Sequence, residues 1–447
     1  MKKFCKLVCM VMATVVCFTS CGAAGKKETP TATPKSQQTD TKEPQSTGTS
    51  AALQSAAGKT GATDIPQTDV KKMDTEQFKT GINNFSYKIF EQLENNENIF
   101  ISPYSMAIAI SMLDNGAEGK SKEEIEQMLG IKDLEDWNAY VKYYMSLNKD
   151  EQAKLLTANS VWFSDKLALS ENVENDFFNP VKFYYDADKK QMDLTSEDAL
   201  NQINKWVSDK TDGMIDSILS DKLEENIKML LLNAVYFKGE WKEKFNKENT
   251  EKEEFHGKDK TTKVDMMSQY NNSYKYVVRN GIKAIELPYA DEKIAMDILL
   301  PEKDGKQINR IFSRLTDKEK SELFSALSQA EAEEIASVKI PKFDMEYGVK
   351  NISKALQESG MESAFGNTDF SKISSELSVD SVLHKAKIEV DEKGTKASAV
   401  TGIIMKETCV LPTEEKNFIA DRPFIFVIRD VENDVILFMG SMQDCES

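Results

Sequence analysis

Hydrophobic residues recur with the period of an amphipathic helix near the start of the folded body. Across residues 74–94 they are mostly three or four positions apart and share one helical face: Phe78, Ile82, Phe85, Ile89, Phe90 and Leu93. Asp74 or Thr75 can cap this helix. The same period predicts helices over residues 198–208 and 349–359, the second ending at Gly360.

A capping box predicts one further helix. Ser121 is followed three positions later by Glu124, the pattern in which each side chain bonds the backbone N–H of the other residue. Gly130 marks the expected end of this helix.

Alternation with a period of two predicts strands in the second half of the chain. In residues 382–390, apolar residues and His384 occupy one face, while Lys385, Lys387 and Glu389 occupy the other. Short apolar runs predict further strands at residues 294–300, 424–428 and 435–439, the last two joined by a hairpin turn. Helices followed by strands predict an α+β fold with large, mostly antiparallel sheets.

The charge balance excludes one class of partner. The chain has 447 residues, a net charge of -17 and 40% hydrophobic residues, which is enough for a large core. Nucleic acid is not an expected partner, because phosphate binding requires clustered Lys and Arg. The same acidity excludes electrostatic docking on an anionic membrane.

Side chains suited to metal binding are few. Four of the six cysteines lie within the first 21 residues, and only Cys409 and Cys445 lie in the body of the chain. Neither has a Cys or His neighbour at ligand spacing, and the chain contains two histidines, His256 and His384. We therefore expect no metal, no cofactor and no histidine-based catalysis. A Cys409–Cys445 disulfide stays open, since the sequence does not define pairing.

The first 70 residues are typical of a secretion signal followed by a tether. The apolar run 7–18 follows a positive start and is too short to span a bilayer. Residues 18–22 resemble a bacterial lipobox with Cys21 as the lipidated residue; an ordinary signal peptide is the alternative. Residues 22–70 are rich in Thr, Ser and Pro and are expected to be disordered. We thus expect a signal over 1–21, a tether over 22–70, and one domain over 71–447, secreted and lipid-anchored to the bacterial cell surface.

Several short blocks of sequence match the motifs of one known family, in the same order. They are Asn98–Ser105, Met112–Gly119, Leu232–Trp241, Val382–Ala386, Glu392–Thr395, Asp421–Phe426 and Ile436–Gly440. Together they resemble the serpins. The resemblance implies an α+β serpin fold with three β-sheets, eight or nine helices and an exposed reactive-centre loop. It also implies a monomeric, metastable protease inhibitor that is not an enzyme.

The implied mechanism is suicide-substrate trapping. A target protease cleaves the loop and stays attached as a covalent acyl complex, while the loop inserts into the main sheet. The loop hinge is expected at Glu392, Gly394, Thr395, Lys396, Ala397, Ser398 and Ala399. Alternation turns Thr395 toward the core and Lys396 toward solvent, and Gly394 supplies a bend. The alternative for this segment is a plain linker of small residues.

The family spacing of fourteen residues after Gly394 places the reactive bond at Thr408–Cys409. Cys409–Val410 and Met405–Lys406 are the alternatives. A small or medium side chain at the cleaved bond favours elastase-like or subtilisin-like serine proteases, or papain-like cysteine proteases, as targets.

The resemblance also implies residues that control opening of the main sheet. Ser102, Ser105, Asn204 and His384 match a polar cluster beneath the sheet, and Trp241 matches a position near its top. The apolar face of its strand independently favours a buried, hydrogen-bonded His384 over a catalytic base. For Trp241, simple core packing is the alternative.

The alternative functions are those of a non-inhibitory serpin and of a hydrolase. A non-inhibitory serpin acting as a cell-surface binding protein would have its loop cleaved without insertion. A hydrolase would need a nucleophile elbow or metal ligands, and the sequence contains neither pattern.

Overall fold

Helix α1 (Thr75–Leu93) begins the folded body, as the hydrophobic period predicts. The computed structural model describes residues 75–95, 97–147, 153–303, 307–366, 369–379, 382–395 and 415–445. The expectations for residues 1–70, including lipidation of Cys21, lie outside this part of the chain. The other α-helices of the described part are α2 (Pro103–Asp114), α3 (Gly119–Leu129), α4 (Leu134–Leu147), α5 (Asn179–Tyr185), α6 (Glu197–Lys210), α7 (Ile308–Phe312), α8 (Asp317–Gln329) and α9 (Ser353–Glu358).

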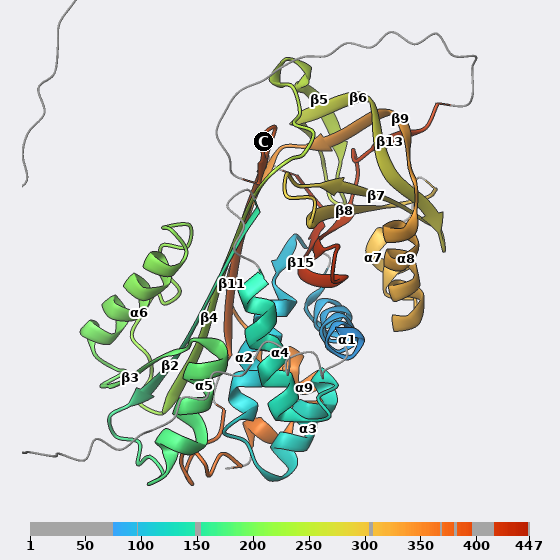
Figure 1. The fold of residues 1–447 in the computed structure, drawn as a ribbon. Helices are drawn as coiled ribbons and strands as arrows, with labels where there is room; N and C mark the ends of the chain where they lie inside the picture. The colour runs from blue at the N-terminus through green and yellow to red at the C-terminus, as the bar shows by residue number, and fades with distance from the viewer. Residues whose placement is uncertain are drawn as a thin grey trace, which may run out of the picture. The chain divides into compact units, whose positions relative to one another are not determined.

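A six-stranded sheet carries the residues that matter most below. Its order is β10 (Phe343–Asn351), β11 (Leu383–Asp391), β12 (Gly394–Thr395), β4 (Met229–Glu240), β2 (Ala153–Ser164) and β3 (Asp188–Met192). Helix α6 lies against one face of this sheet, and α2 and α4 lie on the other side (Figure 1). Both faces are therefore covered.

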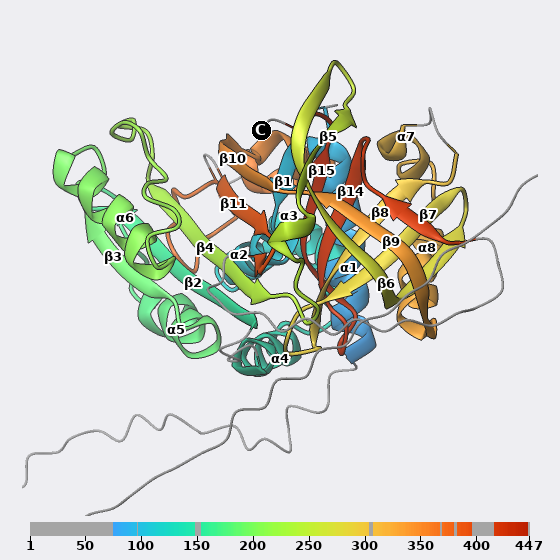
Figure 2. The same cartoon turned by 90° about the horizontal axis from the view of Figure 1, so that it is seen from above.

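A second set of strands shares one long strand between two sheets. Its order is β1 (Ile99–Ile101), β15 (Val435–Met442), β14 (Phe424–Asp430), β8 (Ile294–Pro301), β7 (Ile282–Pro288), β6 (Thr261–Arg279), β9 (Ala332–Pro341) and β13 (Asn417–Ile419), with β5 (Glu251–His256) also paired to β6. The end of β6 pairs with β7, whereas its earlier residues pair with β9 and β5. Together with the six-stranded sheet, this arrangement makes the three sheets that were expected (Figure 2).

Two separate apolar clusters stabilise the described part of the chain. The main core packs α1, α2, α3 and α4 against strands of both sheet systems. Every residue of β14 and β15 is buried, which explains their continuous apolar runs. A smaller cluster lies between α6 and the six-stranded sheet and contains Trp162, Ile203, Val207, Leu230 and Leu232. Helix α6 thus has an apolar contact with the sheet that is independent of the main core.

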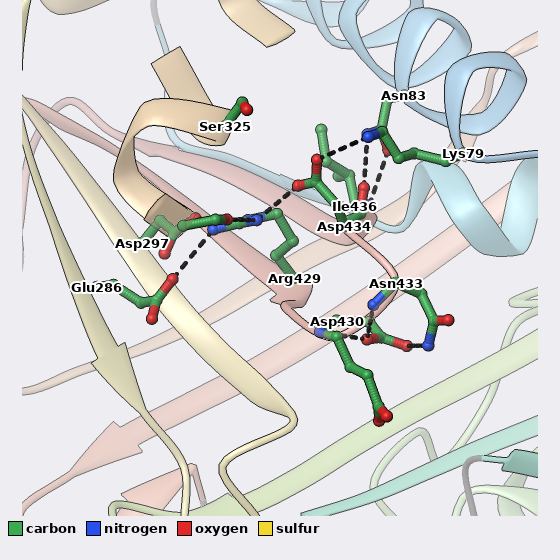
Figure 3. Close-up of polar contacts among 12 residues, drawn as sticks. Lys79, Asn83, Glu286, Asp297, Ser325, Arg429, Asp430, Asn433, Asp434 and Ile436 are labelled. Carbon is green, nitrogen blue, oxygen red and sulfur yellow. Dashed lines mark hydrogen bonds and ion pairs between the residues drawn. The ribbon is translucent and has the colours of Figure 1, made fainter. Parts of the chain in front are cut away.

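A buried ion cluster joins β14 to its neighbours (Figure 3). The Arg429 guanidinium is fully buried and bonds Asp297 on β8 at 2.8 Å, Asp434 at 2.6 Å and Glu286 on β7 at 3.1 Å. Asp434 in the β14–β15 turn also pairs with Lys79 of α1 at 3.1 Å. Buried charges are tolerated only when they are paired in this way.

The expected capping box at Ser121 is wrong. Helix α3 begins two residues earlier, at Gly119, and Ser121 lies inside it. The Ser121 hydroxyl donates to Asp369 at 3.0 Å, and Glu124 accepts from Ser363 instead of from the backbone at residue 121. Residues far along the chain therefore supply the hydrogen bonds that the capping box would have formed between residues 121 and 124. The helix expected from residue 349 is also shorter, because β10 continues to Asn351.

Candidate functional site

Strand β12 consists of two residues lying between two long strands. Thr395 pairs with Val390 of β11 on one side and with Gly239 of β4 on the other. Among the described residues, β4 and β11 each pair with β12 and not with each other. We call the interval between β4 and β11 beyond β12 the seam. The seam can accept more strand residues, because both flanking strands extend well past Thr395.

Gly394 has a backbone that other residues would not adopt easily. Its φ of 145° lies in the region that favours glycine. A Cβ at this position would also lie 2.2 Å from the Gly239 carbonyl oxygen. Both the backbone geometry and the close approach of Gly239 agree with a bend at Gly394.

Thr395 points into the core, as alternation predicts. It is 2% exposed, and its hydroxyl lies 2.9 Å from the Tyr289 hydroxyl. The Tyr289 ring stacks on Trp241 with centroids 4.7 Å apart. The Trp241 indole N–H donates to the Asp391 carbonyl at 2.9 Å. Trp241 is thus both a core residue and a direct contact of the hinge.

Glu392 anchors the hinge from the other side. Its carboxylate accepts from Thr250 at 3.1 Å and from Lys342 at 3.2 Å. Burial opposes its ionisation, but its backbone hydrogen bond and Lys342 outweigh burial and lower the pKa of Glu392. The Phe245 N–H also donates to the Glu392 carbonyl at 2.9 Å. Glu392 is therefore a charged fixed point two residues before Gly394.

Three of the four residues expected in the polar cluster meet beneath the sheet. The Ser102 hydroxyl caps α2 by accepting from the Ser105 N–H at 3.2 Å and donates to the Leu437 carbonyl at 2.8 Å. The Ser102 N–H donates to His384 Nε2 of β11 at 3.3 Å. The Ser105 hydroxyl donates to Asn233 Oδ1 of β4. Helix α2 is thus bonded to both strands that border the seam.

His384 is a neutral acceptor in this arrangement. It is 3% exposed, and burial lowers its pKa to about 3. Because an uncharged ring can accept at Nε2, the Ser102 contact needs no proton on that atom. The residue therefore acts as a hydrogen-bonded buried residue, as its position on the strand indicates.

The expectation for Asn204 is wrong. Asn204 lies on α6, where its amide donates to the Leu219 carbonyl at 2.8 Å and its oxygen accepts from the Ile218 and Leu219 N–H groups at 2.9 Å. It holds the α6–β4 connection and does not reach α2. The residue that completes the cluster is Asn233. Asn233 lies within the block Leu232–Trp241, but its apolar neighbours in the sequence gave no sign of a polar role.

The connection between α6 and β4 reaches across the seam. Lys385 of β11 donates to the Ser217 carbonyl at 3.0 Å and pairs with Glu346 of β10 at 2.8 Å. Since the chain returns to β4 at Met229, this segment contacts both sides of the seam. Alternation places Lys385 on the face opposite His384 but does not predict this contact.

Other expected site residues lie outside the described part of the chain. These are Lys396, Ala397, Ser398 and Ala399 of the hinge, and Thr408 and Cys409 of the reactive bond. Within the described ranges, His, Cys, Asp and Glu form no group of three suited to a metal ion. In the same ranges, no helix combines the length and apolarity needed to cross a bilayer.

Fold and site together define a class: α+β proteins whose main sheet holds the beginning of a long connecting segment as an extra central strand. The family model for serpins (serine protease inhibitors) matches residues 80–445. The chain belongs to the serpin family.

Individual relatives agree with this assignment. An uncharacterized serpin-like protein of Thermococcus kodakarensis is 34% identical over 375 residues, covering 81% of this chain and 84% of that protein. The leukocyte elastase inhibitor of Xenopus laevis is 33% identical, covering 82% and 98%. The native crystal structure of tengpin, a thermophilic serpin, has a TM-score of 0.74 at 31% identity, covering 83% and 95%.

Proposed function

We propose that this protein inhibits proteases by suicide-substrate trapping. The observation that carries the proposal is the seating of Gly394 and Thr395 between β4 and β11. The inserting segment already has its first core-facing side chain in place, and the seam continues beyond it. Insertion would extend a strand that has begun and would not create a new one.

The chemical step belongs to the target protease. Its serine or cysteine nucleophile attacks the carbonyl carbon of Thr408, forming an ester or thioester, and the amine of Cys409 leaves with a proton. Residues 396–407 then add to β12 between β4 and β11, which draws the acylated protease along. Water does not complete the hydrolysis, because the attached active site is distorted before deacylation.

The driving force is strand formation. Each inserted residue gains backbone hydrogen bonds on two sides. Every second side chain after Thr395 then points toward the core, as Thr395 does. The native form is then a kinetically held state whose barrier keeps the sheet closed. Elastase-like or subtilisin-like serine proteases and papain-like cysteine proteases are the proposed targets, from the side chains of Thr408 and Cys409.

The proposed location is the bacterial cell surface. Lipidation at Cys21 and the spacer of residues 22–70 would hold the inhibitor outside the membrane, where extracellular proteases reach it. Radioactive fatty-acid labelling of the intact protein and of a Cys21→Ser variant tests this point. Label in the variant equal to that in the parent would exclude the lipid anchor.

The function is tested by mixing the purified protein with elastase, subtilisin or papain and resolving the products on denaturing gels. We expect a band at the summed mass, and mass analysis of the released peptide to identify the reactive bond. We also expect the cleaved protein to melt at a higher temperature than the intact protein. Cleavage with neither result would support a non-inhibitory serpin acting as a surface binding protein.

A further inference from the structure

The polar cluster beneath the seam continues away from it through two asparagines. The Asn233 amide of β4 donates to Asn159 Oδ1 of β2 at 2.6 Å. The Asn159 amide in turn donates to the Tyr185 carbonyl at 2.8 Å. These bonds lie within one group of elements, because α5 ends at Tyr185 and leads directly into β3, which pairs with β2.

Tyr185 carries the chain of polar contacts to the other side. Its hydroxyl, which is fully buried, donates to Asn138 Oδ1 of α4. The Asn138 amide donates to Asn115 Oδ1 at 2.7 Å, and the Asn115 amide donates to the Ser111 carbonyl of α2 at 2.9 Å. Burial raises the pKa of Tyr185 far above neutral pH, so its hydroxyl keeps its proton and stays a donor.

Helix α4 is anchored to the part of the molecule that does not carry β2, β3 and β4. The Tyr144 hydroxyl donates to the Asp430 carboxylate of β14 at 2.8 Å. Helix α2 is tied to the same side by the Ser102 bond to Leu437 of β15. The Tyr185–Asn138 bond therefore joins the group β2–β3–β4–α5 to the group α2–α4–β14–β15.

Opening of the seam must break bonds between these two groups. One added strand separates β4 from β11 by about 4.8 Å, whereas a hydrogen bond is lost beyond roughly 3.5 Å. If β2, β3, β4 and α5 move as one group, the Asn233–Asn159 and Asn159–Tyr185 bonds survive. Side-chain bonds that join the two groups do not survive, and Ser105–Asn233 and Tyr185–Asn138 are among them.

We propose that Tyr185, with Asn138 and Asn115, forms a second latch that resists opening of the six-stranded sheet. This inference rests on the proposed insertion function and adds to it. The first latch lies directly beneath the seam, at Ser105 and Asn233. The second lies farther from the seam, next to Asn159 of β2, and makes α4 part of the barrier to insertion. Tyr185 is a positioning residue, since it acts through Asn138 and takes no part in the chemical step.

The test separates a latch from ordinary structural support. Tyr185→Phe removes one hydroxyl and keeps the ring. Tyr144→Phe is the matched control, because it also removes a buried tyrosine hydroxyl bond. That bond joins α4 to β14 and so lies within the group α2–α4–β14–β15 and does not cross between the two groups. Each protein is mixed with a fluorescent peptide of residues 394–407, and peptide uptake into the sheet is followed by anisotropy and native gels.

We expect Tyr185→Phe to take up peptide about 3- to 10-fold faster than the wild type, the factor that corresponds to losing one net hydrogen bond. Tyr144→Phe should lower the melting temperature without accelerating uptake. Asn138→Leu should reproduce the acceleration from the other partner, and the double variant with Tyr185→Phe should add little, because the two residues share one bond.

Two results would overturn the latch. Equal uptake by Tyr185→Phe and the wild type would show that the hydroxyl does not restrain the sheet. Equal acceleration by Tyr144→Phe would show only general loosening. If the wild type takes up peptide and traps protease and Tyr185→Phe behaves identically, the second latch is rejected and the proposed inhibitory function stands. If the wild type neither takes up peptide nor traps protease, both the latch and the inhibitory function are rejected.

Discussion

The hydroxyl oxygens of Thr395 and Tyr289 lie 2.9 Å apart in the core beneath β12. Tyr289 is fully buried and stacks on Trp241, which also bonds the backbone at Asp391 and Lys393. The first inserted side chain is therefore held by Tyr289, and Trp241 joins Tyr289 to the end of β11 at Asp391. This relationship makes the start of the hinge a tightly specified position, and it leads to the first prediction.

Replacing Thr395 by Arg should convert the inhibitor into a substrate. A buried, unpaired guanidinium at this position would expel β12 from the sheet, because burying an isolated charge is strongly unfavourable. Gels with a target protease should show loop cleavage with the covalent band reduced at least tenfold. Thr261→Arg, at an exposed position of β6, serves as control and should trap as the wild type does.

Gly394→Ala should also reduce trapping, for a different reason. The added methyl group would meet the Gly239 carbonyl at 2.2 Å, and the φ of 145° would be strained. Gly281→Ala is the matched control, since Gly281 has a φ of 78° with nothing near its missing Cβ. Gly281→Ala should lose about 1 kcal/mol of stability from backbone strain, and Gly394→Ala should lose more, because its methyl group also meets backbone atoms of β4. Only Gly394→Ala should change the ratio of complex to cleaved protein.

His384 should make the native state sensitive to acid. Its folded pKa of about 3 lies below the unfolded value of about 6.5, so the unfolded chain binds more protons between these limits. Stability is then fully present above pH 6.5 and falls as the pH drops toward 3. At pH 5 the loss is about 2 kcal/mol.

Urea unfolding at pH 7 and pH 5 measures this effect. His384→Gln should be less stable than the wild type at pH 7 but should lose about 2 kcal/mol less between the two pH values. His256→Gln, which replaces an exposed histidine, is the control. The contributions of other groups are common to all three proteins and cancel. Parallel pH profiles for wild type and His384→Gln would contradict the prediction.

Arg429→Met should cost about 3–5 kcal/mol of stability. The substitution leaves Asp297 and Glu286 buried without their cation, and burial already raises the pKa of Asp297 to about 7. Arg279→Met removes the partly exposed pair with Glu322 and should cost roughly 0–1 kcal/mol. Chemical denaturation compares the two. Adding Asp297→Leu to Arg429→Met should recover part of the loss; no recovery would indicate a packing defect instead.

Strand faces could be predicted from the sequence because alternation is a local property. In β11, His384, Ala386, Ile388 and Val390 are buried while the residues between them are half-exposed, which the period of two predicts. The bend at Gly394 and the inward Thr395 follow from the same local rules. The family resemblance supplied the order in which these strands meet.

Contacts between distant residues could not be predicted in this way. Asn204 and Asn233 each follow an apolar residue in the sequence, and only the folded chain shows that β4 passes over α2 while α6 lies on the opposite face. The Tyr185–Asn138 contact joins residues 47 positions apart on two helices. The capping box at Ser121 failed for a related reason: Asp369 and Ser363 supply stronger partners from far along the chain.

The separate apolar cluster under α6 has a consequence for how the molecule can change shape. Trp162, Ile203, Val207 and Leu230 keep their mutual contacts wherever their strands go, because they belong to the helix and the strands that it covers. That block therefore keeps its own apolar interior if the strands move, whereas the opposite faces of β2 and β4 contribute Val161, Leu231 and Phe237 to the main core. Resistance to the displacement then comes from that opposite face, where the polar bonds of Asn233 and Tyr185 also lie.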